Sequence, residues 1–252
     1  MELLVVSVAS LFAGFVDAIV GGGGLILVPA LFAVFPATTP ATLFGVNKGA
    51  SIWGTAVATA QYARRVDLRW PVLLPAAAVG FVSSLGGAWL VTLVSGGFLR
   101  KALPFVLLAV LAYTLVKKDM GRHHAPRLSG RAEVLAACCI GGVLGFYDGF
   151  FGPGTGSFFV FLFVRWLGYD FLNASASAKL LNTATNLAAL ILFVSTGHIW
   201  WHLVLPMALA NVLGSVLGAR LALKHGTGFV RTVFIVVVAA LILKTGYSAF
   251  FQ

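Results

Sequence analysis

The chain has 252 residues, of which 60% are hydrophobic and only 10% are Asp, Glu, Lys or Arg, and its formal net charge is +10. Because a soluble domain carries about 25% charged residues, this composition excludes a soluble enzyme and predicts an integral membrane protein. In such a protein the excess of Lys and Arg is first a sign of orientation, since basic residues gather on the cytoplasmic side of membrane spans, and it does not indicate nucleic-acid binding.

Apolar segments separated by short polar stretches follow one another along the whole chain. In order they cover residues 3–20, 25–35, 41–63, 71–94, 98–116, 132–151, 157–167, 174–196, 199–223 and 229–250. A helix needs about 20 apolar residues to cross the hydrocarbon, so most segments predict spans, whereas 25–35 and 157–167 are too short. We therefore expect an all-α polytopic membrane protein. Each short segment is either the returning limb of a re-entrant hairpin or half of a broken span.

Rare residues recur in the second half of the chain at a constant offset of 131 positions. The matched pairs include Asp17 with Asp148, Lys48 with Lys179, Trp70 with Trp201, and Pro75 with Pro206. This pattern predicts two homologous transmembrane repeats, 1–116 and 132–252, joined by the basic linker 117–131. Duplicated units of this kind are typical of secondary transporters.

The basic residues favour an inverted orientation of the second repeat. If the repeats are inverted, three loops lie on one side and hold 11 of the 17 basic residues: Arg64, Arg65, Arg69, Lys117, Lys118, Arg122, Arg127, Arg131, Arg220, Lys224 and Arg231. If they are parallel, the last three move to the other side. The inverted arrangement satisfies the positive-inside rule better, and it makes the linker 117–131 cytoplasmic.

Glycine-rich stretches precede both short segments, at 21–24 and at 152–156. Such backbone does not continue a helix cheaply, so each stretch predicts a half-helix that starts within the membrane with free N–H groups and the positive end of its dipole. We therefore expect two anion-binding breaks, whose candidate residues are Gly22, Gly23, Gly24, Gly154, Thr155, Gly156 and Ser157. The alternative is that the glycines only allow helices to pack closely.

Each repeat also places a lysine inside a span at the head of a polar stripe. Lys48, Ser51 and Thr55 share one helix face, as do Lys179, Asn182 and Asn186, with Asn47 and Thr183 beside them. A buried ammonium group costs several kcal/mol unless it is paired or hydrated. The stripes predict an anion-binding centre next to the breaks. The alternative is that each lysine reaches the membrane surface.

Asp17 and Asp148 each lie four residues before the first glycine of a break. Three roles are open for these acids. Each can accept hydrogen bonds from the backbone of the break, which we favour, or pair with the lysine of its own repeat, or carry a proton that is coupled to transport. The spacing alone does not decide among them.

Motifs for catalysis or for a cofactor are absent from the sequence, which contains no Gly-x-Ser-x-Gly, His-Glu-x-x-His or phosphate-binding loop. His198 and His202 have the i, i+4 spacing of metal ligands, but the sequence His-Ile-Trp-Trp-His is more typical of an interfacial aromatic belt. We therefore expect no enzyme activity, catalytic residue, metal or cofactor. A metal-dependent intramembrane enzyme is the least favoured alternative.

Several of these residues resemble the TauE/SafE family of sulfite and organosulfonate exporters. The resemblance spans nearly the whole chain and depends on Gly14-Phe-Val-Asp17 with the stretch 21–29, on Gly45-Val-Asn-Lys48, and on their echoes at 145–157 and Ala178-Lys179. One departure is that the counterpart of Pro29 is Val160, so the second short segment need not mirror the first.

The resemblance implies a multi-pass transporter of the bacterial inner membrane that moves a small sulfur-containing or organic anion, often outward. Together with the residues above, it predicts export coupled to the proton gradient by alternating access, with the anion held between the two half-helix N-termini and Lys48 and Lys179. The expected partners are the anion, the bilayer and protons; the oligomeric state stays open. A passive anion channel is the main alternative.

Overall fold

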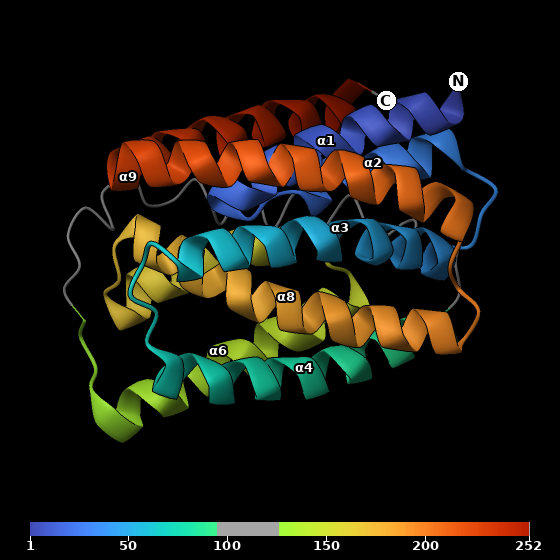
Figure 1. Cartoon of the computed structure of the whole chain (residues 1–252). Helices are drawn as coiled ribbons and strands as arrows, with labels where there is room; N and C mark the ends of the chain where they lie inside the picture. Colours follow the sequence, from blue (N-terminus) through green and yellow to red (C-terminus); the bar gives the residue numbers. More distant parts are fainter. Residues whose placement is uncertain (95–125, 252) are drawn as a thin grey trace.

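A computed structural model describes residues 1–94 and 126–251 of the protein, and these residues form helices joined by short loops (Figure 1). The helices are α1 (Glu2–Val20), α2 (Gly24–Val34), α3 (Pro40–Ala63), α4 (Trp70–Leu93), α6 (Gly130–Phe150), α7 (Thr155–Leu162) with its π-helical extension η1 (Phe163–Leu167), α8 (Phe171–Ser195) and α9 (Trp201–Phe251). The predicted span 98–116 and residues 117–125 of the predicted linker lie outside the described residues.

Five of the described helices are long and apolar enough to cross a membrane: α1, α4, α6, α8 and the stretch Trp201–Val230 of α9. The prediction of an all-α polytopic membrane protein is confirmed. α9 contains nearly all of the two predicted segments 199–223 and 229–250. Between them Gly226 adopts a non-helical conformation (φ 69°, ψ −161°), and the chain doubles back there (Figure 1).

The two short helices are returning limbs of hairpins and not halves of broken spans. α2 has 11 residues and runs back along α1, and α7 likewise turns back from the end of α6. The hairpin of α1 and α2 enters from the end of the molecule at the right of Figure 1, and that of α6 and α7 enters from the opposite end. Both tips therefore lie inside the bundle.

The most buried helices are α3 and α8, which cross the middle of the molecule between α1 and α9 on one side and α4 and α6 on the other (Figure 1). Residues 40–50 of α3 are all buried, and Thr59 of α3 forms a hydrogen bond of 2.9 Å with Thr183 of α8. Polar stripes that would be costly against lipid are thus turned toward each other.

Small residues let the outer helices approach closely. A Cβ atom added to Gly145 of α6 would lie 2.8 Å from the Cα of Gly80 in α4. On the other side, a Cβ at Gly14 of α1 would lie 2.9 Å from the carbonyl carbon of Asn211 in α9. The buried hydroxyl of Ser84 donates to the carbonyl of Thr185, which ties α4 to α8.

The helix starts follow the offset seen in the sequence. Gly24, Pro40 and Trp70 begin α2, α3 and α4, and Thr155, Phe171 and Trp201, each 131 residues later, begin α7, α8 and α9. This register and the opposed hairpins are what an inverted duplication would produce. The duplication itself stays a prediction.

We predict that Gly145→Ala lowers the melting temperature of the detergent-solubilised protein by about 2–10 °C, because the new methyl group forces α4 and α6 apart. Gly86→Ala is the matched control, since a Cβ there would meet only a Phe146 ring carbon at 4.0 Å. That control variant should melt within about 2 °C of the parent or higher, as alanine favours helix. Equal losses in both variants would contradict the packing argument.

Candidate functional site

The two glycine-rich breaks meet each other inside the bundle. Gly21 ends α1 with φ at 78°, and Gly154 precedes α7 with φ at 83°, a region that L side chains rarely adopt. The N–H of Ser157 donates to the carbonyl of Gly21 at 2.6 Å, and the Ser157 hydroxyl reaches the carbonyls of Val20 and Gly21. The start of α7 therefore caps the end of α1, and the second half satisfies backbone groups that the first half leaves exposed.

The N-cap residues of both short helices, Gly23 and Gly154, are glycines and make no side-chain cap. In α2, the N–H groups of Leu25 and Ile26 donate to the carbonyls of Gly22 and Gly23 at 3.0 Å. In α7, Thr155 and Phe158 donate to Gly152 and Gly154 in the same manner. Gly24 and Gly156 lie in these first turns, and both line the cavity described below. The positive ends of both helix dipoles thus point to one place.

Two buried ion pairs cross between the halves of the chain. Lys48 of α3 lies 2.6 Å from Asp148 of α6, and Lys179 of α8 lies 2.9 Å from Asp17 of α1. The side chains of Lys48 and Asp148 are 3% and 2% exposed, and those of Lys179 and Asp17 are 0% and 13% exposed. The four charges cancel, which limits the cost of placing them inside the membrane. The alternative in which each aspartate pairs with the lysine of its own repeat is therefore wrong.

The favoured role of the aspartates, which is to accept hydrogen bonds from the backbone of the break, is supported for Asp17. Asp17 Oδ1 accepts a long hydrogen bond of 3.4 Å from the N–H of Gly23 in the break, while its Oδ2 accepts from Lys179. The Asp148 carboxylate forms the ion pair with Lys48. A proton-carrying role for either acid stays a prediction.

A chain of hydrogen bonds continues from Lys48 into α8. Its Nζ donates to Asn186 Oδ1 at 2.9 Å, Asn186 Nδ2 reaches the Thr55 hydroxyl at 3.5 Å, and that hydroxyl donates to the carbonyl of Ser51. The buried amides of Asn47 and Asn182 differ from Asn186, because in the part of the chain that the structure describes their Oδ1 atoms have no hydrogen-bond partner. Such groups are costly unless a ligand or water satisfies them.

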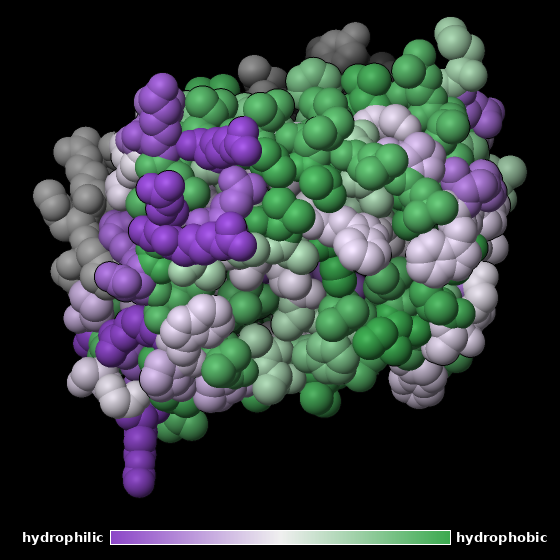
Figure 2. All heavy atoms as spheres, viewed as in Figure 1, coloured by the Kyte–Doolittle hydropathy of each residue, from purple (hydrophilic) through white to green (hydrophobic). Residues whose placement is uncertain are grey.

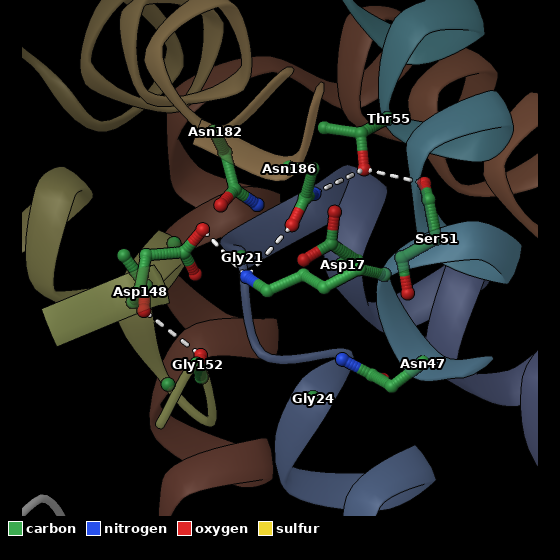
Figure 3. Close-up of a pocket in the computed structure, with 14 residues that line it drawn as sticks. Asp17, Gly21, Gly24, Asn47, Ser51, Thr55, Asp148, Gly152, Asn182 and Asn186 are labelled. Carbon is green, nitrogen blue, oxygen red and sulfur yellow. Dashed lines mark hydrogen bonds and ion pairs between the residues drawn. The ribbon is translucent and has the colours of Figure 1, made fainter. Parts of the chain in front are cut away.

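These groups surround a small polar cavity of about 20 Å³ (Figure 3). Its lining residues are Asp17, Gly21, Gly24, Asn47, Lys48, Ser51, Thr55, Asp148, Gly152, Gly154, Thr155, Gly156, Asn182 and Asn186. Figure 3 shows Asp148, Asn182 and Asn186 converging on the same space from α6 and α8. A cavity of this volume has room for about one water molecule, so the structure holds the site closed.

Twelve of the 17 residues predicted for the site line this cavity. The five that do not line it are Gly22, Gly23, Ser157, Lys179 and Thr183. Ser157 instead caps α1, and the Thr183 hydroxyl donates to the carbonyl of Lys179 within α8. Lys179 does not line the cavity and forms its ion pair with Asp17. Sequence reasoning missed Gly21 and Gly152 as lining residues, although their place at the start of each glycine stretch could have indicated them.

The two histidines lie apart from the cavity. His198 Nδ1 is 3.2 Å from the Thr42 hydroxyl, and the ring of His202 stacks on Trp200. Within residues 1–94 and 126–251, no group of three or more His, Cys, Asp and Glu side chains is placed to hold a metal ion.

We predict that the crossed pairs are energetically coupled. Lys48→Gln or Asp148→Asn alone should cost about 3–5 kcal/mol of unfolding free energy, because each leaves a buried charge unpaired. The double variant should recover part of this loss, giving a coupling energy of about 0.5–3 kcal/mol in mixed-micelle unfolding. The matched cycle joins Lys48→Gln with Asp17→Asn, and a larger coupling in that cycle would contradict the crossed arrangement.

Known proteins similar to this chain are membrane transporters. Residues 6–245 match the family described as "Sulfite exporter TauE/SafE". The chain is 37% identical over 238 residues to "Probable membrane transporter protein ORF9" of Sinorhizobium sp, covering 94% of this chain and 89% of that protein. It is 36% identical over 241 residues to "Probable membrane transporter protein YfcA" of Escherichia coli K12, covering 95% and 88%.

A third relative, "Probable membrane transporter protein" of Haemophilus influenzae, is 35% identical over 241 residues, which cover 94% of this chain and 91% of that protein. No solved structure matches the chain. The family match covers nearly the whole chain, including both hairpins and both ion pairs around the cavity. The chain therefore belongs to the TauE/SafE family of membrane transporters.

Proposed function

We propose that this transporter is a secondary transporter that carries a small sulfur-containing or organic anion, such as sulfite or a sulfonate, across the bacterial inner membrane by alternating access. The observation that carries the proposal is the cavity at the meeting point of the two breaks. There the ammonium group of Lys48, the side-chain amides of Asn47 and Asn182, whose N–H groups can donate, and two helix N-termini converge. Donors and positive charge of this kind fit the oxygens of a small oxyanion.

The closed cavity supports a cycle in which the site opens to one side at a time. A volume of about 20 Å³ is too small for sulfite or a sulfonate, which have at least three oxygen atoms, since it has room for about one water molecule. Binding then requires the tips of the two hairpins to separate. Because the hairpins enter from opposite ends (Figure 1), withdrawal of one or the other would open the site to opposite sides, as alternating access requires.

Charge balance supports the coupling of anion and proton. The closed site holds two lysines and two aspartates and is neutral. An anion that binds Lys48 competes with Asp148 and leaves one excess negative charge inside the membrane, which is costly. A proton on Asp148 would remove that charge and release Lys48 for the anion, so the two would travel together.

Export is the direction named in the description of the family, and we propose it for this chain. An anion that leaves with a proton moves no net charge but carries the proton out against the inward proton gradient, so export requires an outward anion gradient that is larger than the proton gradient. A passive channel lined by the same groups is the alternative, and it requires no proton step.

We predict that Lys48→Gln combined with Asp148→Asn weakens anion binding by at least about 10-fold, because a charge-assisted contact is lost while the site stays neutral. Binding is measured by calorimetry or thermal shift with sulfite, thiosulfate, sulfoacetate and taurine. Asn182→Ala should also weaken binding, whereas Ser175→Ala should not. The buried Ser175 hydroxyl, which has no hydrogen-bond partner among the described residues, lies on the same helix but does not line the cavity. Unchanged affinity in the Lys48/Asp148 variant would remove the cavity as the anion site.

We predict further that an imposed pH gradient, at clamped membrane potential, drives uphill movement of the anion in proteoliposomes toward the alkaline side. Asp148→Asn with Lys48 intact should abolish the uphill component. Conductive flux that follows the anion gradient and ignores the pH gradient would instead support the channel. Saturable flux that does not depend on the pH gradient would indicate a carrier without proton coupling, and it would contradict the proton-carrying role of Asp148.

A further inference from the structure

A second concave site lies at the molecular surface and shares no lining residue with the cavity. It is a cleft of about 560 Å³ where the end of α3 meets the start of α8 and the middle of α9. Four basic residues line it: Arg64 and Arg65 after α3, and Arg220 and Lys224 on α9. Its volume is in the range of sites that hold a small organic ligand.

The four basic side chains are exposed and available to a ligand. In the described ranges 1–94 and 126–251, none of them forms a salt bridge with an acid, and no acid lines the cleft. Like charges that line one cleft repel each other unless an anion lies between them. Gln61 and the apolar side chains of Leu172 and Leu223 form the rest of the wall, so the cleft suits an anion that is attached to an apolar body.

An exposed apolar stripe on α9 leads directly to the cleft. Leu209, Leu213 and Leu217 are 71%, 60% and 53% exposed and follow one another at the four-residue spacing of one helix face. Arg220 and Lys224 lie seven residues after Leu213 and Leu217, which places them on nearly the same face. Figure 2 shows hydrophilic side chains over the left ends of α3 and α9, and hydrophobic ones over most of the remaining face.

We propose that this cleft binds the phosphate headgroup of an anionic phospholipid, whose acyl chain lies along the leucine stripe of α9. Arg64 and Arg65 follow α3, and Arg220 and Lys224 lie on α9 just before its turn at Gly226. With inverted repeats, the positive-inside rule assigns both groups to the cytoplasmic side, where juxtamembrane basic clusters attract anionic lipids. The stripe favours a lipid over a free anion, because a soluble anion gains nothing from exposed leucines. A bound headgroup would join α3, which carries Lys48, to α9 and α8.

The test compares phospholipids that differ in headgroup charge. Native mass spectrometry of the purified full chain with phosphatidylglycerol or phosphatidylcholine measures the lipid-bound fraction, and inorganic phosphate and glycerol phosphate serve as soluble competitors. Phosphatidylglycerol should bind more tightly than phosphatidylcholine, and millimolar free phosphate should not displace it. Arg220→Gln combined with Lys224→Gln should weaken phosphatidylglycerol binding about 30-fold, since each surface charge contributes to the attraction.

Arg131→Gln is the matched control, because Arg131 is an exposed basic residue that lines a different cleft. It should leave phosphatidylglycerol binding unchanged, and all variants should keep the parent's melting temperature within a few degrees, as surface substitutions do. Equal weakening by Arg131→Gln would show attraction to net charge without a site. Equal binding of both lipids, unchanged binding in the double variant, or displacement by free phosphate would each overturn the proposal, and the last would identify a soluble-anion site.

Discussion

Backbone polar groups that leave a helix inside hydrocarbon must find partners within the protein, and in this structure the two helix breaks find them in each other. Ser157 of the second break donates to the carbonyls at the end of α1, and Gly21 and Gly156 approach so closely that neither can carry a side chain. The meeting point fixes where both hairpins stop. It thereby also fixes where Lys48, Asp148 and the two helix N-termini converge.

The crossed ion pairs explain how so polar a centre remains stable between apolar layers. Lys48 and Lys179 each take the aspartate of the other half, so neither half can withdraw without separating two charges. A cluster that is neutral when closed, and that an anion or a proton would unbalance, is suited to switch between arrangements. The same contacts that hold the bundle together would therefore be the ones that a transported ion rearranges.

Much of the fold was predictable from local patterns. The apolar segments, the two short limbs and the interruption near Gly226 depend on hydropathy and glycine content, which lie in neighbouring residues. Most residues of the cavity were also predictable, because Lys48, Asn182 and their stripes are polar where lipid would otherwise be the neighbour. The path of the short limbs was open, since a chain of 11 apolar residues fits a hairpin and a broken span equally well.

The sequence by itself determined which residues are polar inside the membrane, because the cost of burying a charge is a property of each residue and its neighbours. Only the tertiary structure decided their partners. The pairing of Asp17 with Lys48 within one half was one of the open alternatives, yet Lys48 pairs with Asp148, 100 residues away along the chain. Pairing depends on which helix faces meet. The same packing places Lys48 in the lining of the cavity and leaves Lys179 out of it, and no local sequence pattern predicts either outcome.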